Sequence, residues 1–290
     1  ILNSTDEFFV NLTGGTKIMS IGAYTFFKEY ASHIFYIPIG KNHYSQIFPK
    51  TNQTDVPIHF RASLVEYLTA YGVKITNPSQ MHSLVKQPTE TEVFFKCYLQ
   101  TNHSEKAILS GLRESRSMQA KFVNTSAFSG LDQVLCQLQF SPKETGRLNK
   151  SEIRYLTGEW LEEYLLARIN DFHQLSPPYS GVGIEISRAT IRNEFDVMVM
   201  LNNTLHVFEC KTSVFTGEKS TLWNDTLYKL QALRKDFGLS AKAYIVTLSE
   251  IGAAKGQIKL DRSEVFGIQV IDRNTLQSAE MLEDILKKMR

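Results

Sequence analysis

Two adjacent asparagines, Asn202 and Asn203, separate two strand-like runs rich in Val, Leu, Phe and Met, and this pattern constrains the fold most. Asparagine tolerates positive φ, so the pair suits a primed two-residue turn between antiparallel strands. Because side chains alternate along a strand, counting outward from the turn fixes which residues face each other. The expected facing pairs are Leu201–Thr204, Met200–Leu205, Met198–Val207, Asp196–Glu209 and Glu194–Lys211. The sequence therefore predicts a β-hairpin with charged residues in register near its open end.

This hairpin places the carboxylates of Asp196 and Glu209 opposite each other, with Cβ atoms roughly 5 Å apart, where like charges destabilise a sheet. Apolar neighbours of Glu209 indicate burial, which makes an unpaired charge more costly. A divalent cation between the carboxylates would relieve the repulsion, and Lys211 lies on the same face. A Glu-x-Lys pattern alone is also common as a surface cross-pair. The in-register Asp196 is what favours a metal-dependent phosphodiesterase site.

Asp196 together with Glu209-Cys210-Lys211 resembles the PD-(D/E)XK nuclease superfamily. The resemblance implies that Asp196, Glu209 and the backbone carbonyl of Cys210 hold Mn²⁺ or Mg²⁺, ions that prefer oxygen ligands. It also implies that Lys211 is catalytic, because its ammonium would stabilise the attacking hydroxide or the pentavalent phosphorane. Glu194 is expected to be a salt-bridge partner or an outer-shell group.

The superfamily carries a further glutamate on a helix before the first of these strands, and residues 158–169 have helical periodicity. By resemblance, Glu162 is expected to be this catalytic carboxylate, whereas Glu163 is expected to be an acidic flank of the helix. A second helix over 223–235 and a buried strand over 243–248 follow the hairpin. These elements give the αβββαβ order of the nuclease core.

The N-terminal end predicts a βαβ unit, with strands over 8–12 and 33–39 and an apolar helix over 18–30. The turn between the first strand and the helix consists of Thr13, Gly14, Gly15, Thr16 and Lys17. It presents backbone N–H groups at a helix N-terminus, together with hydroxyls and an ammonium, and such a turn can bind phosphates. The alternative is a tight connection without a ligand. The turn has neither the Walker spacing nor G-x-G-x-x-G.

Together, the Thr-Gly-Gly-Thr-Lys turn, the acidic helix and the hairpin motifs resemble the CRISPR-associated Rossmann-fold (CARF) nucleases of type III immunity that carry a PD-(D/E)XK effector. The implied fold class is α/β, with a Rossmann-like sensor domain and a restriction-endonuclease-like domain. The resemblance implies a homodimer that binds cyclic oligoadenylate, commonly cyclic tetra-adenylate, across its axis and then cleaves DNA, RNA or both. The implied ligand-binding residues are Thr13, Gly14, Gly15, Thr16 and Lys17.

The expected domains are a sensor over 1–85, a connector over 86–148 and a nuclease domain over 149–290. The chain begins at Ile1, without methionine, directly before what would be a late strand of the sensor, so the sensor is expected to be N-terminally incomplete.

The connector is expected to contain helices over 92–99 and 104–112 and strands over 122–123 and 134–140. Helices followed by a hairpin suggest a winged-helix fold. Several basic side chains either contact nucleic acid or form solvated faces: Arg113, Arg116, Lys121, Lys229, Arg234 and Lys235.

Composition fits an intracellular enzyme, expected in the cytoplasm. Three cysteines do not form a disulfide framework, and the sequence has no run as long as a membrane span. A net charge of +2 gives no global attraction to nucleic acid, so any attraction must be local. Two other functional classes stay open. One is a restriction- or repair-type nuclease without second-messenger control, and the other is a nucleotide-sensing protein whose nuclease fold is inert.

Overall fold

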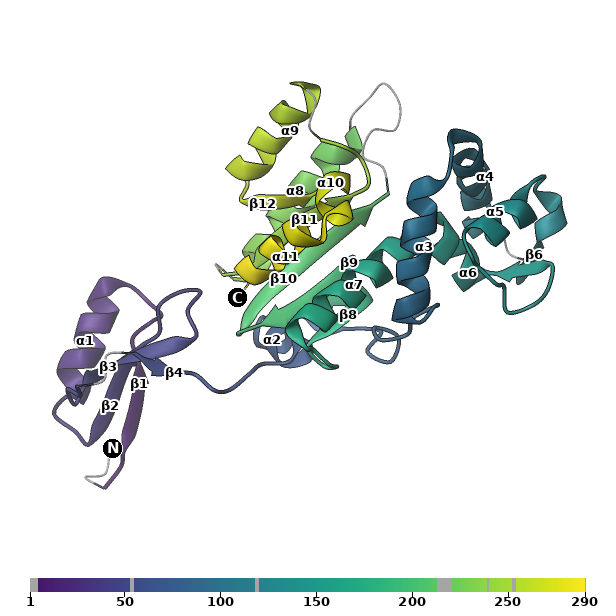
Figure 1. The fold of residues 1–290 in the computed structure, drawn as a ribbon. Helices are drawn as coiled ribbons and strands as arrows, with labels where there is room; N and C mark the ends of the chain where they lie inside the picture. The colour runs from purple at the N-terminus through teal and green to yellow at the C-terminus, as the bar shows by residue number, and fades with distance from the viewer. Residues whose placement is uncertain are drawn as a thin grey trace.

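The computed structural model describes most of the chain, namely residues 5–52, 55–117, 120–212, 221–238, 240–251 and 254–289. Within the described helices, the structure does not describe the side chains of residues 221–222, 233–236 and 254–259. The predicted roles of Arg234 and Lys235 therefore lie outside the described residues. Figure 1 shows a small N-terminal module, a large sheet with helices on both faces, and a mostly helical connector beside that sheet. The mixed α/β class expected from the sequence is confirmed.

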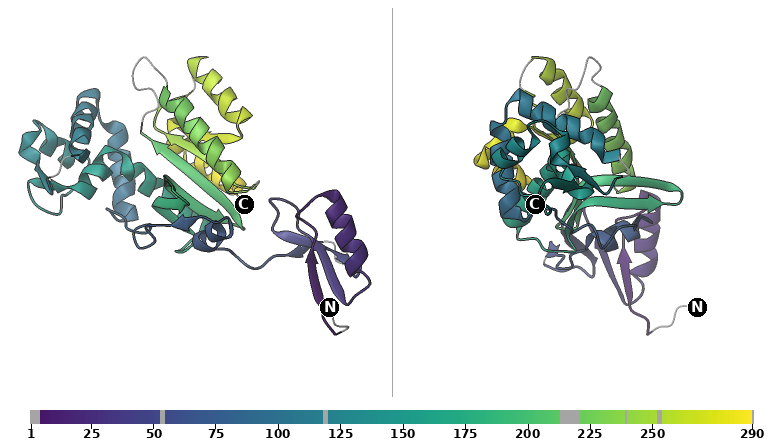
Figure 2. Two further views of the ribbon diagram at one scale, coloured as in Figure 1. Left: turned by 180° about the vertical axis from the view of Figure 1, so that it is seen from behind. Right: turned by 90° about the vertical axis from the view of Figure 1, so that its right-hand side faces the viewer.

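The N-terminal module is a sheet with strand order β1-β2-β3-β4 and one helix. Its elements are β1 (Phe8–Asn11), α1 (Lys17–Phe27), β2 (Ser32–Tyr36), β3 (His43–Phe48) and β4 (Val56–Pro57). Strands β1 and β2 are parallel, so the predicted βαβ unit is present. Helix α1 begins where the hydroxyl of Thr16 accepts a hydrogen bond from the N–H of Met19, an N-cap. Figure 2 shows α1 lying along one face of this sheet.

The second sheet has the order β12-β11-β10-β9-β8-β5 among the described strands. Its strands are β5 (Lys74–Ile75), β8 (Ser180–Arg188), β9 (Ile191–Leu201), β10 (Thr204–Lys211), β11 (Lys242–Thr247) and β12 (Ile268–Ile271). Helices of this region are α2 (Leu64–Ala70), α7 (Trp160–His173), α8 (Thr221–Asp236), α9 (Ala254–Val265), α10 (Arg273–Gln277) and α11 (Ala279–Lys288). The predicted αβββαβ order is confirmed as α7, β8, β9, β10, α8 and β11.

The β9–β10 hairpin turns through Asn202 and Asn203, whose φ angles are 49° and 61°. Its register is the predicted one from the turn as far as the pair Val197–Phe208. Beyond that pair, the Asp196 side chain accepts the N–H of Cys210 at 2.6 Å. The main-chain ladder is thus replaced by a side-chain contact near the charged end of the hairpin.

The hairpin separates two cores, because alternate side chains on each strand point to opposite faces. Val197, Val199 and Phe208 belong to the core that contains Trp160 of α7. Met198, Leu205 and Val207 belong to the core that contains Trp223 of α8. Full burial of one such side chain contributes about 1.5–3 kcal/mol, so the strands are firmly held on both faces.

Helix α2 and strand β5 join the large sheet although they lie before residue 85, the expected end of the sensor. Ile75 pairs with Ile186 of β8, and Leu64 and Leu68 pack in the same core as Trp223. The three-domain division by residue number stays a prediction.

The connector contains α3 (Pro88–Gln100), α4 (His103–Arg113), β6 (Phe122–Asn124), α5 (Leu131–Gln137), β7 (Arg147–Asn149) and α6 (Lys150–Arg154). The two predicted helices are confirmed as α3 and α4, and β6 covers the predicted strand at 122–123. The predicted strand over 134–140 is wrong, because α5 occupies its first half. Buried Leu131, Val134, Leu135 and Leu138 follow a helical spacing that the Val- and Phe-containing run obscured. The winged-helix shape stays a prediction.

Candidate nuclease site and sensor turn

The charged end of the hairpin forms a compact cluster of Asp196, Glu209 and Lys211. The Lys211 ammonium lies 3.2 Å from Asp196 Oδ2 and 2.8 Å from Glu209 Oε1. It also donates to the carbonyl of Cys210 at 3.2 Å. Lys211 therefore pairs with both carboxylates in this structure. Among the described residues no ion pair between Lys211 and Glu194 is seen; on the β8 side, Glu194 lies opposite Glu185.

A second ammonium enters the cluster from helix α8. Lys229 Nζ lies 2.8 Å from Glu209 Oε2 and donates to the carbonyl of Glu194 at 3.1 Å. The sequence marked Lys229 only as a basic residue that contacts phosphate or solvent. Its place here could not be read from spacing, because it depends on how α8 packs against the large sheet.

Burial and neighbouring charges act in opposite directions in this cluster. Burial opposes ionisation of Glu209, but Lys211 and Lys229 outweigh it and hold the Glu209 pKa below its usual range. Burial and then the charge of Glu209 raise the pKa of Asp196, against the attraction of Lys211. The pKa of Asp196 is thus raised while that of Glu209 is lowered. A further positive charge would therefore favour the ionised form of Asp196 more than that of Glu209.

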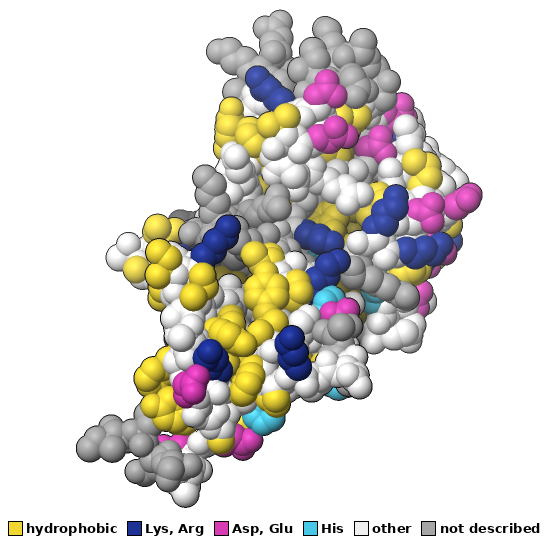
Figure 3. Space-filling view, turned by 90° about the vertical axis from the view of Figure 1, so that its left-hand side faces the viewer, with side chains coloured by type: hydrophobic (Ala, Val, Ile, Leu, Met, Phe, Trp, Pro, Cys, Tyr) yellow, Lys and Arg dark blue, Asp and Glu magenta, His cyan; other side chains and the backbone are white. Residues whose placement is uncertain are grey.

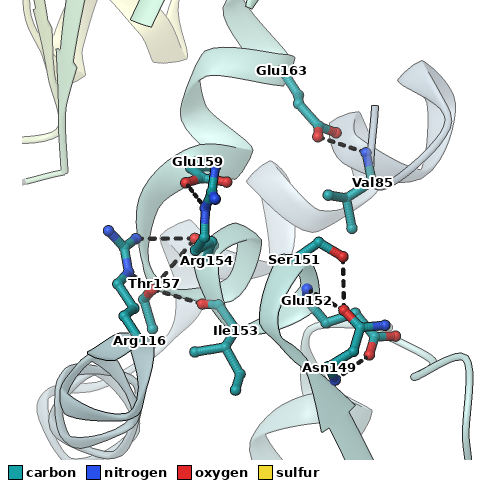
Figure 4. Close-up of polar contacts among 10 residues, drawn as sticks. All are labelled: Val85, Arg116, Asn149, Ser151, Glu152, Ile153, Arg154, Thr157, Glu159 and Glu163. Carbon is teal, nitrogen blue, oxygen red and sulfur yellow. Dashed lines mark hydrogen bonds and ion pairs between the residues drawn. The ribbon is translucent and has the colours of Figure 1, made fainter. Parts of the chain in front are cut away.

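Glu162 and Glu163 of α7 have different surroundings. Glu163 accepts hydrogen bonds from the N–H groups of Val85 at 2.7 Å and Lys86 at 3.3 Å, and Figure 4 shows the contact with Val85. Burial, and next the charge of Asp196, raise the pKa of Glu162 well above its usual range. The charges of Glu162 and Asp196 thus oppose each other, whereas Glu163 ties the chain before α3 to α7.

Two connector arginines hold the segment that leads into α7. The guanidinium of Arg113 donates to the carbonyl of Thr157 at 2.7 Å, and Arg116 Nε donates to the Thr157 hydroxyl at 2.6 Å. Arg116 also donates to the carbonyl of Arg154 at 3.0 Å (Figure 4). This segment, Tyr155–Glu159, is one π-helical turn, a feature common at functional sites. The sequence had no signal for these contacts, although it marked both arginines.

The donor set has the chemistry that a hard divalent cation needs, since Asp196 and Glu209 supply carboxylate oxygens. However, among the described residues no three His, Cys, Asp or Glu side chains converge as a preformed metal centre. The Lys211 ammonium contacts both carboxylates in the place where a shared cation would be expected. The residues fit the ion, provided that the lysine contacts rearrange.

The Gly-rich turn borders a broad groove in the N-terminal module. Thr13 Oγ1 accepts the N–H of Ile37 at 2.7 Å, which fixes the turn to the end of β2. Gly15 has a φ of +89°, a left-handed conformation that favours glycine. A Cβ added at Gly14 would meet no described atom within 4 Å. The groove has a volume of about 590 Å³, and Thr13, Gly15 and Lys17 line it.

Helix α1 exposes an apolar surface beside this groove. Ile18 is 82% exposed, and Met19, Ile21 and Phe26 are each at least half exposed. Figure 3 shows hydrophobic side chains gathered on this side of the molecule. A continuous exposed apolar surface marks a place where another surface binds.

The hairpin turn contacts the N-terminal module at the end opposite to the charged cluster. Asn203 Nδ2 donates to Asn42 Oδ1 at 2.9 Å and to the carbonyl of Phe60 at 2.8 Å. Asn203 Oδ1 accepts the N–H of Ala62 at 2.8 Å. One side chain thus joins the β2–β3 loop, the segment between the sheets and the hairpin.

Comparison with protein families identifies both ends of the chain. Residues 2–67 match the Card1 CARF domain, and residues 149–288 match the Card1-like endonuclease domain. The chain therefore belongs to the Card1-type proteins that join a CARF domain to an endonuclease domain.

Two solved structures share this fold. Protein VC1899 from Vibrio cholerae is 22% identical, with a TM-score of 0.71 over 96% of this chain and 74% of that protein. Can2 from Sulfobacillus thermosulfidooxidans, solved in complex with cyclic tetra-adenylate, is 21% identical, with a TM-score of 0.69 over 96% of this chain and 76% of Can2. No curated protein gives a match. Among the described residues, none of the helices is long and apolar enough to cross a membrane.

Proposed function

We propose that the chain is a cytoplasmic, metal-dependent endonuclease that cleaves DNA, RNA or both and is activated by cyclic tetra-adenylate in type III CRISPR defence. The observation that carries the nuclease part is the cluster of Asp196, Glu209 and Lys211 inside a domain of the endonuclease family. Mn²⁺ or Mg²⁺ is the ion that this oxygen donor set favours.

Each residue of the cluster has a chemical role in this proposal. Asp196 and Glu209, with the carbonyl of Cys210, would hold the ion, which when bound polarises the scissile phosphate and provides a nucleophilic hydroxide at neutral pH. Lys211 would then be released from its carboxylate partners, and its ammonium would stabilise negative charge on the phosphate in the transition state. Glu162, whose pKa the charge of Asp196 raises, would supply a further carboxylate to the site.

The sensor part rests on the groove at the Gly-rich turn and on the match to the CARF family. Can2, which shares the fold, is solved with cyclic tetra-adenylate. We assign ligand contacts to the turn, namely to Thr13, Gly14, Gly15, Thr16 and Lys17. A homodimer would cover the exposed apolar side chains of α1.

Activation requires that ligand binding at the sensor changes the nuclease site. The β9–β10 hairpin offers a direct physical path, because Asn203 contacts the N-terminal module at one end and Asp196 and Glu209 lie at the other. A displacement of the module would pull on the hairpin turn, and the rigid, doubly buried strands would transmit it. Loosening the contacts between Lys211 and the carboxylates would then admit the ion.

A cleavage assay tests the proposal. Single-stranded DNA, single-stranded RNA and supercoiled plasmid are incubated with Mn²⁺, Mg²⁺ or EDTA, each with and without cyclic tetra-adenylate. We expect cleavage that needs both metal and activator. Cleavage that needs metal but ignores the activator would favour the restriction- or repair-type alternative. Binding of the activator without any cleavage would favour a sensor with an inert nuclease fold.

A further inference from the structure

A cavity of about 320 Å³ lies between the connector and the large sheet, and the nuclease cluster does not account for it. The connector and the segment before α7 form one wall, and residues that follow strands β10, β11 and β12 form the other. Its most important lining residues are Tyr98, Lys106, Arg113, Thr212, Ser249 and Arg273. In α/β sheets, ligands bind at the carboxyl ends of parallel strands, and β10, β11 and β12 are parallel.

The charges in this cavity are unbalanced. Lys106, Arg113 and Arg273 line it, and none of its described lining residues is a carboxylate. Glu250 contacts Arg273 from outside the lining, at 3.7 Å from Nη1. Arg273 Nε is buried and has no hydrogen-bond partner. Burial, followed by the charge of Arg273, lowers the pKa of Lys106. Cations brought together in this way are destabilised unless an anion joins them.

One lining residue of the cavity is the next residue in the chain after the proposed catalytic lysine. Thr212, which lines it, directly follows Lys211 at the end of β10. The Arg113 guanidinium lies 3.4 Å from Thr212 Oγ1 and is held at Thr157. A nucleic-acid strand with its scissile phosphate at Lys211 would therefore pass the mouth of the cavity, and its next charged groups are backbone phosphates.

We propose that this cavity binds a non-scissile backbone phosphate of the substrate strand, with Lys106 and Arg273 as its principal ligands. The site would fix the strand relative to Lys211 and thereby set the position of cleavage. Arg113 would help at the mouth, although its contact with Thr157 also makes it structural. The inference rests on the proposed nuclease function, because the phosphate belongs to the substrate of that site.

The test measures oligonucleotide binding and cleavage by the full chain. The double variant K106Q/R273Q is compared with wild type, with the charge-retaining variant K106R, and with K96Q as a matched control. Lys96 lies on the neighbouring helix α3, pairs with Glu92 and is 66% exposed outside the cavity. Binding is measured in Ca²⁺ with single-stranded oligonucleotides in which one linkage at a time is an uncharged methylphosphonate. Inorganic phosphate is added separately as a competitor.

We expect one linkage whose neutralisation weakens wild-type binding about tenfold or more, as lost charge-assisted hydrogen bonds do. The same change should have no effect on K106Q/R273Q, while K96Q and K106R should behave like wild type. The slope of log affinity against log salt should fall by about 0.7 in the double variant, as expected for one lost phosphate contact on a single strand. At saturating substrate the double variant should cleave again, but the position of cleavage along the oligonucleotide should no longer be fixed.

Three results would overturn the inference. The first is that no single neutralised linkage weakens binding by wild type without affecting K106Q/R273Q. The second is that K96Q loses as much affinity as K106Q/R273Q. The third is that inorganic phosphate inhibits binding equally in wild type and K106Q/R273Q. Failure of the proposed function itself looks different, because wild-type protein would then neither bind nor cleave any oligonucleotide with metal and activator present. Thermal melting of each variant separates misfolding from loss of the contact.

Discussion

The N-terminal module and the large sheet bury their apolar residues very differently. Strand β10 buries Leu205 and Phe208 completely, and helices cover the sheet on both faces. Helix α1 has no buried residue, and Ile18 alone is 82% exposed. The large sheet thus buries its apolar residues on both faces, whereas α1 leaves several apolar side chains exposed among the described residues. A catalytic site needs rigid support, whereas elements that move in response to a ligand are drawn from the less stable parts of a protein.

The largest expected effect tests whether the two parts have separable functions. Glu209→Gln removes a carboxylate that the proposed ion needs, so cleavage should fall at least about 10³-fold in Mn²⁺. Calorimetric binding of cyclic tetra-adenylate should be unchanged, because the N-terminal module is untouched. Glu185→Gln, at an exposed carboxylate on neighbouring β8, is the control and should keep its activity. Near-normal cleavage by Glu209→Gln would refute the site.

A matched pair of phenylalanines tests the difference in burial directly. Phe208 on β10 is 0% exposed, whereas Phe9 on β1 is 70% exposed. Phe208→Ala should lower the free energy of unfolding by about 3–5 kcal/mol, because it leaves a cavity in a close-packed core. Phe9→Ala should change it by no more than about 0.5 kcal/mol. Urea unfolding of both variants measures the two values, and similar losses would mean that β1 is covered in solution.

A buried histidine in the large sheet should make the free energy of unfolding depend on pH. His206 is buried beside Tyr244, and burial, then Lys242 and His173, lower its pKa to about 3 from 6.5. Because the unfolded chain binds this proton more readily, His206 destabilises the fold as the pH falls below 6.5 toward 3. Between pH 7 and pH 5 the loss should be about 2 kcal/mol.

His206→Gln removes this titration, so its unfolding free energy should depend less on pH than that of wild type over the same interval. Urea titrations at pH 7 and pH 5 provide the comparison. His33→Gln in β2 of the N-terminal module is the control, since His33 is 41% exposed and pairs with Glu7. An equal change in that control would show that burial in the large sheet is not the cause.

A substitution in the sensor turn should change the affinity for the ligand rather than the free energy of unfolding. Lys17→Ala removes one ammonium from the groove, and the loss of a charge-assisted contact should weaken binding of cyclic tetra-adenylate by about 1.5–3 kcal/mol. Saturating ligand should restore cleavage, because the nuclease cluster is intact. Calorimetry and the activation midpoint measure the effect, with Lys41→Ala as an exposed control in the same module. An unchanged affinity would indicate that the turn is only a tight connection.

The sequence predicted the hairpin well because its period, its turn residues and its charges all agreed on one register. Asp196, Glu209 and Lys211 lie just beyond the paired part of the hairpin, which ends at Val197–Phe208, and side-chain contacts bring them together there. Lys229 and the cavity at Arg273 could not be predicted in this way, since they depend on how separate helices pack against the sheet. The strand predicted over 134–140 was wrong because the segment has the composition of a strand, whereas its buried residues are spaced as in a helix.

The smallest expected effect concerns the contact that joins the two parts. Asn203→Gly keeps a residue that accepts the positive φ of the turn but removes the hydrogen bonds to Asn42, Phe60 and Ala62. If these bonds couple sensor and nuclease, the ratio of cleavage rates with and without cyclic tetra-adenylate should fall about fivefold, which corresponds to about 1 kcal/mol of coupling. Ligand affinity and unfolding free energy should change little. Asn202→Gly makes the same backbone change one position earlier and should leave the ratio unchanged. A normal ratio in Asn203→Gly would show that activation reaches the carboxylates by another route, most directly through the dimer that α1 is proposed to form.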